Sequence, residues 1–83
     1  MTPEYRAIRN ITAREFTAAL RKDGFSLSGY RGSHRYYIHP DGRRVEVAYH
    51  LRSDSFPPKT LRIMVARRAK WVAEDLQRLG LVK

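Results

Sequence analysis

Residues 32–43 decide the fold of this chain, and they read Gly-Ser-His-Arg-Tyr-Tyr-Ile-His-Pro-Asp-Gly-Arg. The last part of this stretch is a strong turn signal. Pro40 fixes a negative φ, the Asp41 side chain bonds to nearby backbone, and Gly42 accepts a left-handed conformation. The turn lies between two runs with the composition of strands. The sequence therefore predicts a β-hairpin whose strands cover about 34–39 and 43–49.

The length of the hairpin loop decides which face of the sheet His34 occupies. A two-residue loop would place His34 opposite Tyr49 and point it toward the core, whereas a three-residue loop with a glycine bulge places it opposite Ala48. Pro-Asp-Gly favours the three-residue loop, because Pro suits the first turn position and Gly the left-handed one. The alternation over 45–49 marks the valine face as buried. Tyr37 then joins the core, and the open face is shared by His34, Tyr36, Arg44, Glu46 and His50.

A first helix is predicted over residues 13–23. Thr12 and Glu15 have the spacing of a capping box, in which each side chain bonds to the backbone amide of the other. Gly24 follows the last turn and is suited to a left-handed C-cap.

The remaining segments give one more strand and a last helical region. Apolar residues at 25, 27 and 30 predict a short strand that Gly29 interrupts and Gly32 ends. A helix is predicted to begin at 57–58, where proline is tolerated, and to end at Gly80. Its apolar stripe consists of Leu61, Met64, Val65, Ala69, Val72, Leu76 and Leu79. Trp71 lies off this stripe and indicates a kink or break near residues 70–72.

The order helix, three strands, helix predicts an α+β fold of the type α-β-β-β-α. Two helical segments are available to cover one face of a three-stranded antiparallel sheet, and the other face stays open to solvent or ligand. The 83 residues fit one domain, 1–83, with 1–10 as an N-terminal extension and 71–83 as an extended C-terminal helix.

The composition points to a polyanionic partner. Lys and Arg number 17 against 8 Asp and Glu, for a net charge of +9, and most of the basic residues are Arg, whose planar fork binds phosphate or carboxylate. The absence of Cys excludes disulfides, thiolate catalysis and cysteine zinc sites. No apolar run is long enough for a membrane span, so we expect a cytoplasmic protein with no membrane partner.

The chain resembles the HicA family of small bacterial toxins, also called YcfA-like proteins, over most of its length. The most specific part of the resemblance is Gly32-Ser33-His34 followed at the family's spacing by Pro40-Asp41-Gly42-Arg43. It extends to the capped first helix, Gly24-Phe25, the Val45 and Val47 strand, His50, and the helix opening at 57–61. The chain departs from the family pattern at Ala48 in place of Pro, at Ala69 in place of Gly, and in a longer tail from Trp71.

The resemblance implies a fold similar to double-stranded RNA-binding domains, ribonuclease activity against mRNA, and a HicB-type antitoxin as partner. The family's catalytic histidine falls on His34, and an imidazole exchanges protons near neutral pH. We therefore expect the toxin of a type II toxin-antitoxin system. It would be an endoribonuclease (mRNA interferase) that cleaves through the 2′-hydroxyl without metal or other cofactor, with His34 as general acid or base.

Substrate-binding residues are expected around His34. They are Gly32, Ser33, Arg35, Tyr36, Arg44 and His50. Arg side chains would hold phosphates, Tyr36 would stack on an unpaired base, and His50 is a candidate second proton carrier. His39 has the opposite strand parity and is expected to be structural, which disfavours a three-histidine metal site.

Two rival functions follow from the same features. The first is a non-catalytic RNA-binding module that uses the same basic open sheet face. The second is an adaptor whose basic surface docks only an acidic protein.

Overall fold

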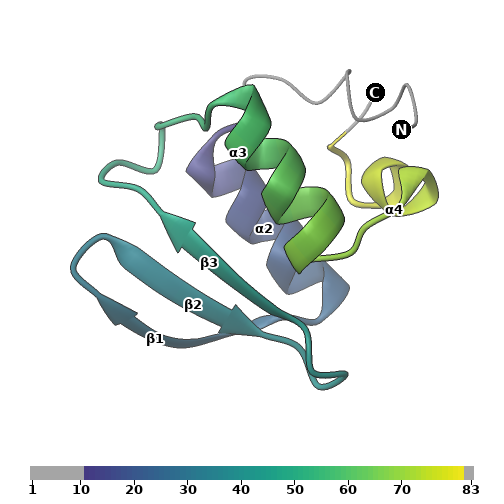
Figure 1. Ribbon diagram of the computed structural model, residues 1–83, viewed down its shortest axis with the longest axis horizontal. Coiled ribbons are helices and arrows are strands. Elements are labelled where there is room, and N and C mark those ends of the chain that lie inside the picture. The colour runs from purple at the N-terminus through teal and green to yellow at the C-terminus, as the bar shows by residue number, and fades with distance from the viewer. Residues whose placement is uncertain (1–10, 82–83) are drawn as a thin grey trace.

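The computed structural model describes residues 11–81 and shows an α+β arrangement (Figure 1). The elements, in chain order, are α2 (Ala13–Asp23), β1 (Ser26–Arg31), β2 (His34–Ile38), β3 (Arg44–Ala48), α3 (Pro58–Ile63), the π-helical turn η1 (Met64–Arg68) and α4 (Ala73–Arg78). The strands form one antiparallel sheet in the order β1-β2-β3. The predicted α+β fold with an open three-stranded sheet is confirmed. The extension expected at residues 1–10 lies outside the described residues.

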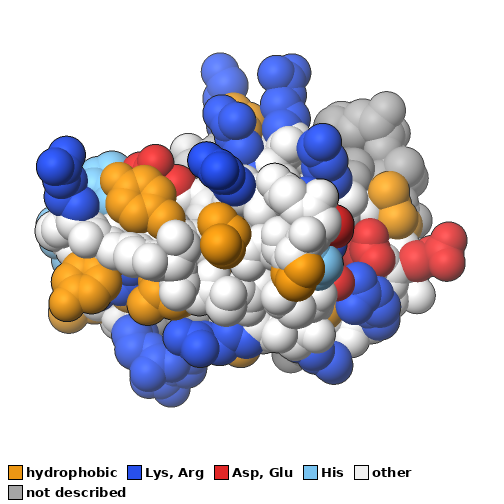
Figure 2. Space-filling view, turned by 90° about the horizontal axis from the view of Figure 1, so that it is seen from below, with side chains coloured by type: hydrophobic (Ala, Val, Ile, Leu, Met, Phe, Trp, Pro, Cys, Tyr) orange, Lys and Arg blue, Asp and Glu red, His pale blue; other side chains and the backbone are white. Residues whose placement is uncertain are grey.

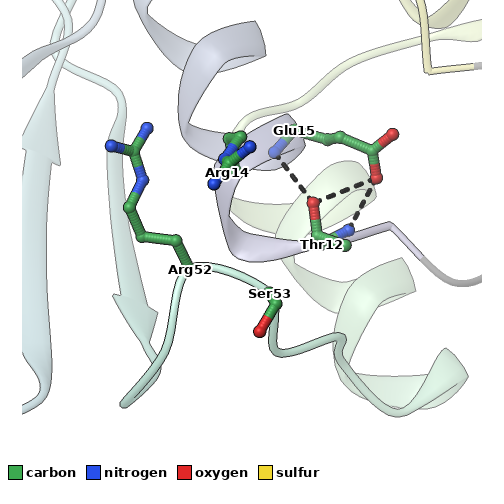
Figure 3. A pocket seen from close by; sticks show the side chains of 5 residues that line it. All are labelled: Thr12, Arg14, Glu15, Arg52 and Ser53. Carbon is green, nitrogen blue, oxygen red and sulfur yellow. Dashed lines mark hydrogen bonds between the residues drawn. The ribbon is translucent and has the colours of Figure 1, made fainter.

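Helix α2 has the predicted bounds because both of its ends are capped. The Glu15 amide donates to the Thr12 hydroxyl at 3.1 Å, and the Thr12 amide donates to the Glu15 carboxylate at 2.9 Å, as the dashed lines of Figure 3 show. At the other end Gly24 has a φ of 107°, in the left-handed region. A Cβ atom at Gly24 would lie 2.9 Å from the His39 Nε2 atom, so both the backbone conformation and the space require glycine here.

The hairpin between β2 and β3 has the predicted three-residue loop. The His39 amide donates to the Arg43 carbonyl at 2.9 Å, and Gly42 has a φ of 98°. Tyr37 pairs with Val45 and His34 pairs with Ala48. The register that directs His34 away from the core is therefore confirmed.

Strand β1 is one of the two edge strands of the sheet, and it joins β2 through a two-residue turn. Gly32 opens this turn with a φ of 59°, the position at which a type II′ hairpin turn takes glycine. The pairing shifts between Leu27 and Gly29, which is the interruption predicted at Gly29. Leu27 is 41% exposed and Tyr30 72% exposed, because β1 lies at the sheet edge farthest from the helices (Figure 1).

Both long helical segments pack on the same face of the sheet. Figure 1 shows α2 and α3 on one side of the sheet, with β1 at the sheet edge farthest from them. One hydrophobic core joins the two helical segments to β2 and β3, and its largest fully buried side chains are Phe16, Leu20, Val45, Val47, Leu61, Val65, Trp71 and Leu76. The opposite face of the sheet is left open, as predicted.

The last helical region breaks where Trp71 enters the core. Helix α3 begins at Pro58, widens into η1, and ends with the Ala69 amide donating to the Met64 carbonyl at 2.8 Å. Lys70 then has a φ of 58°, which turns the chain and places Trp71 at 1% exposure. The predicted break near residues 70–72 is confirmed. Val72, which the helical spacing assigned to the apolar stripe, is instead 56% exposed.

No helix within residues 11–81 has both the length and the apolar character needed to cross a membrane.

Candidate functional site

His34 stands at the start of β2 on the open face of the sheet. Its direct neighbours across the sheet are Arg31 on β1 and Ala48 on β3. Residues that pair directly in an antiparallel sheet project from the same face, with Cβ atoms about 4.5–5.5 Å apart. Arg31 and the His34 imidazole therefore stand side by side on this face, and half of the His34 side-chain surface is exposed.

The His34 ring contacts a carboxylate on its own face. Its Nδ1 atom is bonded to the Oε2 atom of Glu46, which lies on β3 diagonally across from His34 and directly opposite Tyr36. An ionised carboxylate only accepts hydrogen bonds, so this contact suits the form of the ring that is protonated on Nδ1. The other ring nitrogen, Nε2, is on the opposite side of the imidazole from Glu46.

Arg31 supplies a cation next to the imidazole. It is exposed, and within residues 11–81 no carboxylate lies at ion-pair distance from its guanidinium group. A guanidinium group with this freedom can bind a phosphate through two hydrogen bonds.

Two other predicted site residues share the open face at different distances from His34. Tyr36 is 38% exposed and occupies the row next to His34, between Gly29 and Glu46. Arg44 is opposite Ile38 at the other end of β3, about 13 Å from Ala48 at the usual rise per strand residue. Tyr36 is thus close to the imidazole, and Arg44 lies at the far end of the same face.

Arg35 projects from the other face of the sheet. It pairs with Tyr30 and Val47, and its guanidinium group lies 4.3 Å from the centroid of the Tyr49 ring. It donates to the Ser33 carbonyl at 3.1 Å. The structure does not bring Arg35 together with His34 on one face, and its contacts support the turn that precedes His34.

Gly32 and Ser33 form that turn, and they position His34 through the backbone. The Ser33 carbonyl accepts from the Tyr49 amide at 3.1 Å, which closes the end of the sheet beside His34. A Cβ atom at Gly32 would meet nothing within 4 Å, so its positive φ alone accounts for glycine there.

His50 lies beyond the end of β3, in the loop that leads to α3, and it is exposed. Its amide donates to the Asp54 carboxylate at 3.1 Å, and so does the amide of Leu51, at 2.9 Å. These backbone bonds, from Leu51 and then His50, hold the pKa of Asp54 below its ordinary value of 3.8.

His39 and Arg43 are structural. The His39 Nε2 atom lies 2.8 Å from the Asp23 carbonyl oxygen, and its ring packs edge-on to Phe25 at 5.0 Å. Arg43 donates to the Ala69 carbonyl at 2.6 Å and to the Asp41 carboxylate at 2.7 Å. Both side chains are occupied in joining the hairpin to the helical layer, as predicted for His39.

Two surface depressions in the described part of the chain lie away from His34. One, of about 330 Å³, is lined by Thr12, Arg14, Glu15, Arg52 and Ser53 (Figure 3). Its helix-end amides are already bonded to the chain, because those of Ala13 and Arg14 donate to the carbonyls of Asp54 and Arg52. The other is a shallow basic strip on the outside of α3 and η1, lined by Lys59, Arg62, Ile63, Ala66 and Arg67. No group of three His, Cys, Asp or Glu side chains in residues 11–81 is arranged to hold a metal ion.

The surface charge suits a polyanion. Figure 2 shows Lys and Arg side chains along two opposite margins of the molecule, with hydrophobic side chains between them. Phosphates bind guanidinium and ammonium groups, while bases stack on exposed rings, so this mixture is typical of single-stranded nucleic-acid binding.

The fold and the site together define a small basic α+β protein that carries an exposed histidine and arginine on an open antiparallel sheet. A family model described as the HicA toxin of bacterial toxin-antitoxin systems matches residues 13–71, well over half of the chain. The chain therefore belongs to the HicA toxin family, and the role of a toxin with an antitoxin partner follows from that membership. A comparison with curated proteins gave no match.

The sequence placed Glu46 on the His34 face without a role, and Arg31 is not among the substrate-binding residues predicted from it. The pairing register contains the missing signal, because it places both residues next to His34. The register between β1 and β2 depends on the Gly32 turn and on the shift near Gly29, which composition alone does not fix.

Proposed function

We propose that this protein is a metal-independent endoribonuclease that cleaves mRNA through the ribose 2′-hydroxyl, with His34 as the residue that exchanges the proton. The observation that carries the proposal is the position of His34, half exposed on the open sheet face and directly across from Arg31. A polynucleotide can reach this face because both long helical segments lie on the other one.

The reaction needs few groups. The 2′-oxygen forms a bond to phosphorus, the bond from phosphorus to the 5′-oxygen breaks, and a 2′,3′-cyclic phosphate remains. His34 exchanges the proton at either the 2′-oxygen or the 5′-oxygen, and water exchanges the proton at the other one. Arg31 neutralises the charge that develops on the phosphoryl oxygens. Tyr36 stacks on an unpaired base, and Arg44 binds a phosphate farther along the chain. The proposed partner is a HicB-type antitoxin.

The test is the variant His34→Ala, measured by growth after induction and by cleavage of purified RNA in the presence of a chelator. We expect cleavage to fall by at least about 100-fold, the usual contribution of a general acid or base, and growth arrest to disappear. The free energy of unfolding should change by no more than about 0.5 kcal/mol, because the ring is half exposed.

Two results would contradict the proposal. Full toxicity of a folded His34→Ala protein would remove His34 from the reaction. Wild-type protein that binds RNA with a steep salt dependence but never cuts it would be a non-catalytic RNA-binding module.

A further inference from the structure

We infer that Glu46 is a positioning residue, which fixes the proton of His34 on Nδ1 and leaves Nε2 as the atom that takes the proton from the 2′-hydroxyl. This inference rests on the proposed function, and it makes His34 the base of the first step. It starts from the contact between the His34 Nδ1 and the Glu46 Oε2 atoms.

The contact determines which nitrogen reacts. A carboxylate accepts a hydrogen bond and donates none, so Nδ1 holds the proton and the neutral ring has its lone pair on Nε2. When Nε2 takes a proton, the ring becomes a cation that remains bonded to the Glu46 carboxylate. The same carboxylate therefore sets the orientation of the ring before the transfer and stabilises its charge afterwards.

The ion pair between Glu46 and His34 adds little to the folding stability of the protein, so stability does not account for a carboxylate at position 46. The side chains of His34 and Glu46 are 50% and 49% exposed, and an ion pair this exposed contributes little to folding. Glu46 is also the one acidic residue in the three strands, whose sequences are SLSGYR, HRYYI and RVEVA. On a face proposed to bind phosphates, a carboxylate opposes the ligand unless it acts on another group, and His34 is the group it touches.

The geometry also separates Glu46 from the substrate. Nδ1 and Nε2 lie on opposite sides of the imidazole, so a ring held by Glu46 at Nδ1 presents Nε2 away from β3. Arg31 stands across β2 from Ala48, on that other side of His34. A phosphate held by Arg31 would therefore approach the Nε2 side of the ring, while Glu46 remains behind it.

The experiment compares Glu46→Gln with the control Glu74→Gln. Glu74 is an exposed residue of α4, so this control removes the same charge at a place away from the open face. With wild-type protein and RNA in chelator, we expect kcat of Glu46→Gln to fall about 10–100-fold, with KM changed less than about twofold. Glu74→Gln should match wild type in both constants. A KM change without a kcat change would mean that Glu46 binds substrate, and it would contradict the inference.

A second measurement does not depend on activity. Long-range ¹H–¹⁵N NMR spectra report which imidazole nitrogen of His34 carries the proton in the neutral ring. We expect the proton on Nδ1 in wild type and in Glu74→Gln, with loss of this preference in Glu46→Gln. A wild-type ring protonated on Nε2 would overturn the inference. If wild-type protein cuts no RNA at all, the proposed function fails, and the spectra still test the pairing of Glu46 with His34.

Discussion

The face of the sheet on which His34 lies depends on the length of the hairpin loop, and a change of one residue would reverse it. Side chains alternate between the faces of a strand, so a loop shorter by one residue would turn His34 toward the helices and bury it. Pro40, Asp41 and Gly42 prevent this, because the Gly42 φ of 98° completes the three-residue loop. The exposure of the histidine is therefore a consequence of turn chemistry at the other end of β2.

Arg31 offers a prediction at the same scale. Arg31→Gln should weaken RNA binding. The negative slope of log K against log salt concentration should become shallower by about 0.7, the value for one phosphate contact on a single strand. The reason is its place directly across from His34, with a guanidinium group that no described carboxylate engages. Binding would be measured with His34→Ala protein, so that the RNA stays intact.

Arg67→Gln is the matched control, because Arg67 is an exposed residue of η1 on the helical side of the molecule. It should leave the slope at its starting value. Equal slopes for the Arg31 and Arg67 variants would show that RNA binding does not distinguish the open face from the helical surface.

The alternation of side chains along a strand is the part of the candidate site that could be predicted from the sequence. Parity placed His34, Tyr36, Arg44 and Glu46 on one face, and the register agrees. The same parity places Arg35 on the helical side, across from Val47, so Arg35 does not join His34 as the predicted substrate-binding residue. The contact of Glu46 with His34 could not be predicted, because it depends on side-chain rotamers across a diagonal pair.

At the scale of elements, one carboxylate joins the end of α2 to segments far along the chain. The Asp23 side chain is 6% exposed and accepts from the Trp71 indole at 2.9 Å. It is also bonded to Arg43, at 3.1 Å, and to Arg78 of α4. Asp23 thereby holds the hairpin loop, the break before α4 and α4 itself against α2.

These contacts make stability depend on pH. Burial raises the pKa of Asp23, but the hydrogen bonds from Arg78 and Trp71 and the charges of Arg43 and Arg78 outweigh burial, so the pKa lies below its ordinary value of 3.8. The native protein is thus stabilised by ionised Asp23 above the ordinary pKa, and this contribution is lost as pH falls through the lowered pKa.

Asp23→Asn should therefore reduce the free energy of unfolding by about 2–4 kcal/mol at pH 7 and by much less near pH 3. Urea unfolding at the two pH values measures the difference, with Glu74→Gln as an exposed control that changes little at either. An equal loss at pH 7 and pH 3 would show that the charge of Asp23 does not matter.

The elements themselves were largely predictable, and the exceptions have a local cause. The cap residues Thr12 and Gly24 fixed both ends of α2, and Pro58 fixed the start of α3. After Met64 the hydrogen bonds widen to a π-helical turn and the chain breaks at Lys70, so one continuous helical period misplaces Trp71 and Val72, whereas Ala69, Leu76 and Leu79 are buried as it predicts. Trp71 is buried through this change, and its bond to Asp23 links residues too far apart in sequence for a local pattern to reveal.

At the scale of the whole molecule, the two faces of the sheet have different surroundings. One face binds both helical segments and the shared core, and the other presents His34, Arg31 and Tyr36 to solvent. In the proposed function, the net charge of +9 would attract a polyanion to the molecule, and the open face would determine where it reacts. Membership of the HicA toxin family agrees with this division, since a toxin needs both a target and a surface for its antitoxin.

The most direct test of the central claim uses an RNA oligonucleotide that the protein cuts, and the same oligonucleotide with one 2′-deoxyribose at the cleavage position. We predict that the RNA yields a 2′,3′-cyclic phosphate and a 5′-hydroxyl end in chelator, and that the deoxy substitution abolishes cleavage at that position with binding unchanged. Cleavage of the deoxy-substituted strand at the same bond would contradict the account.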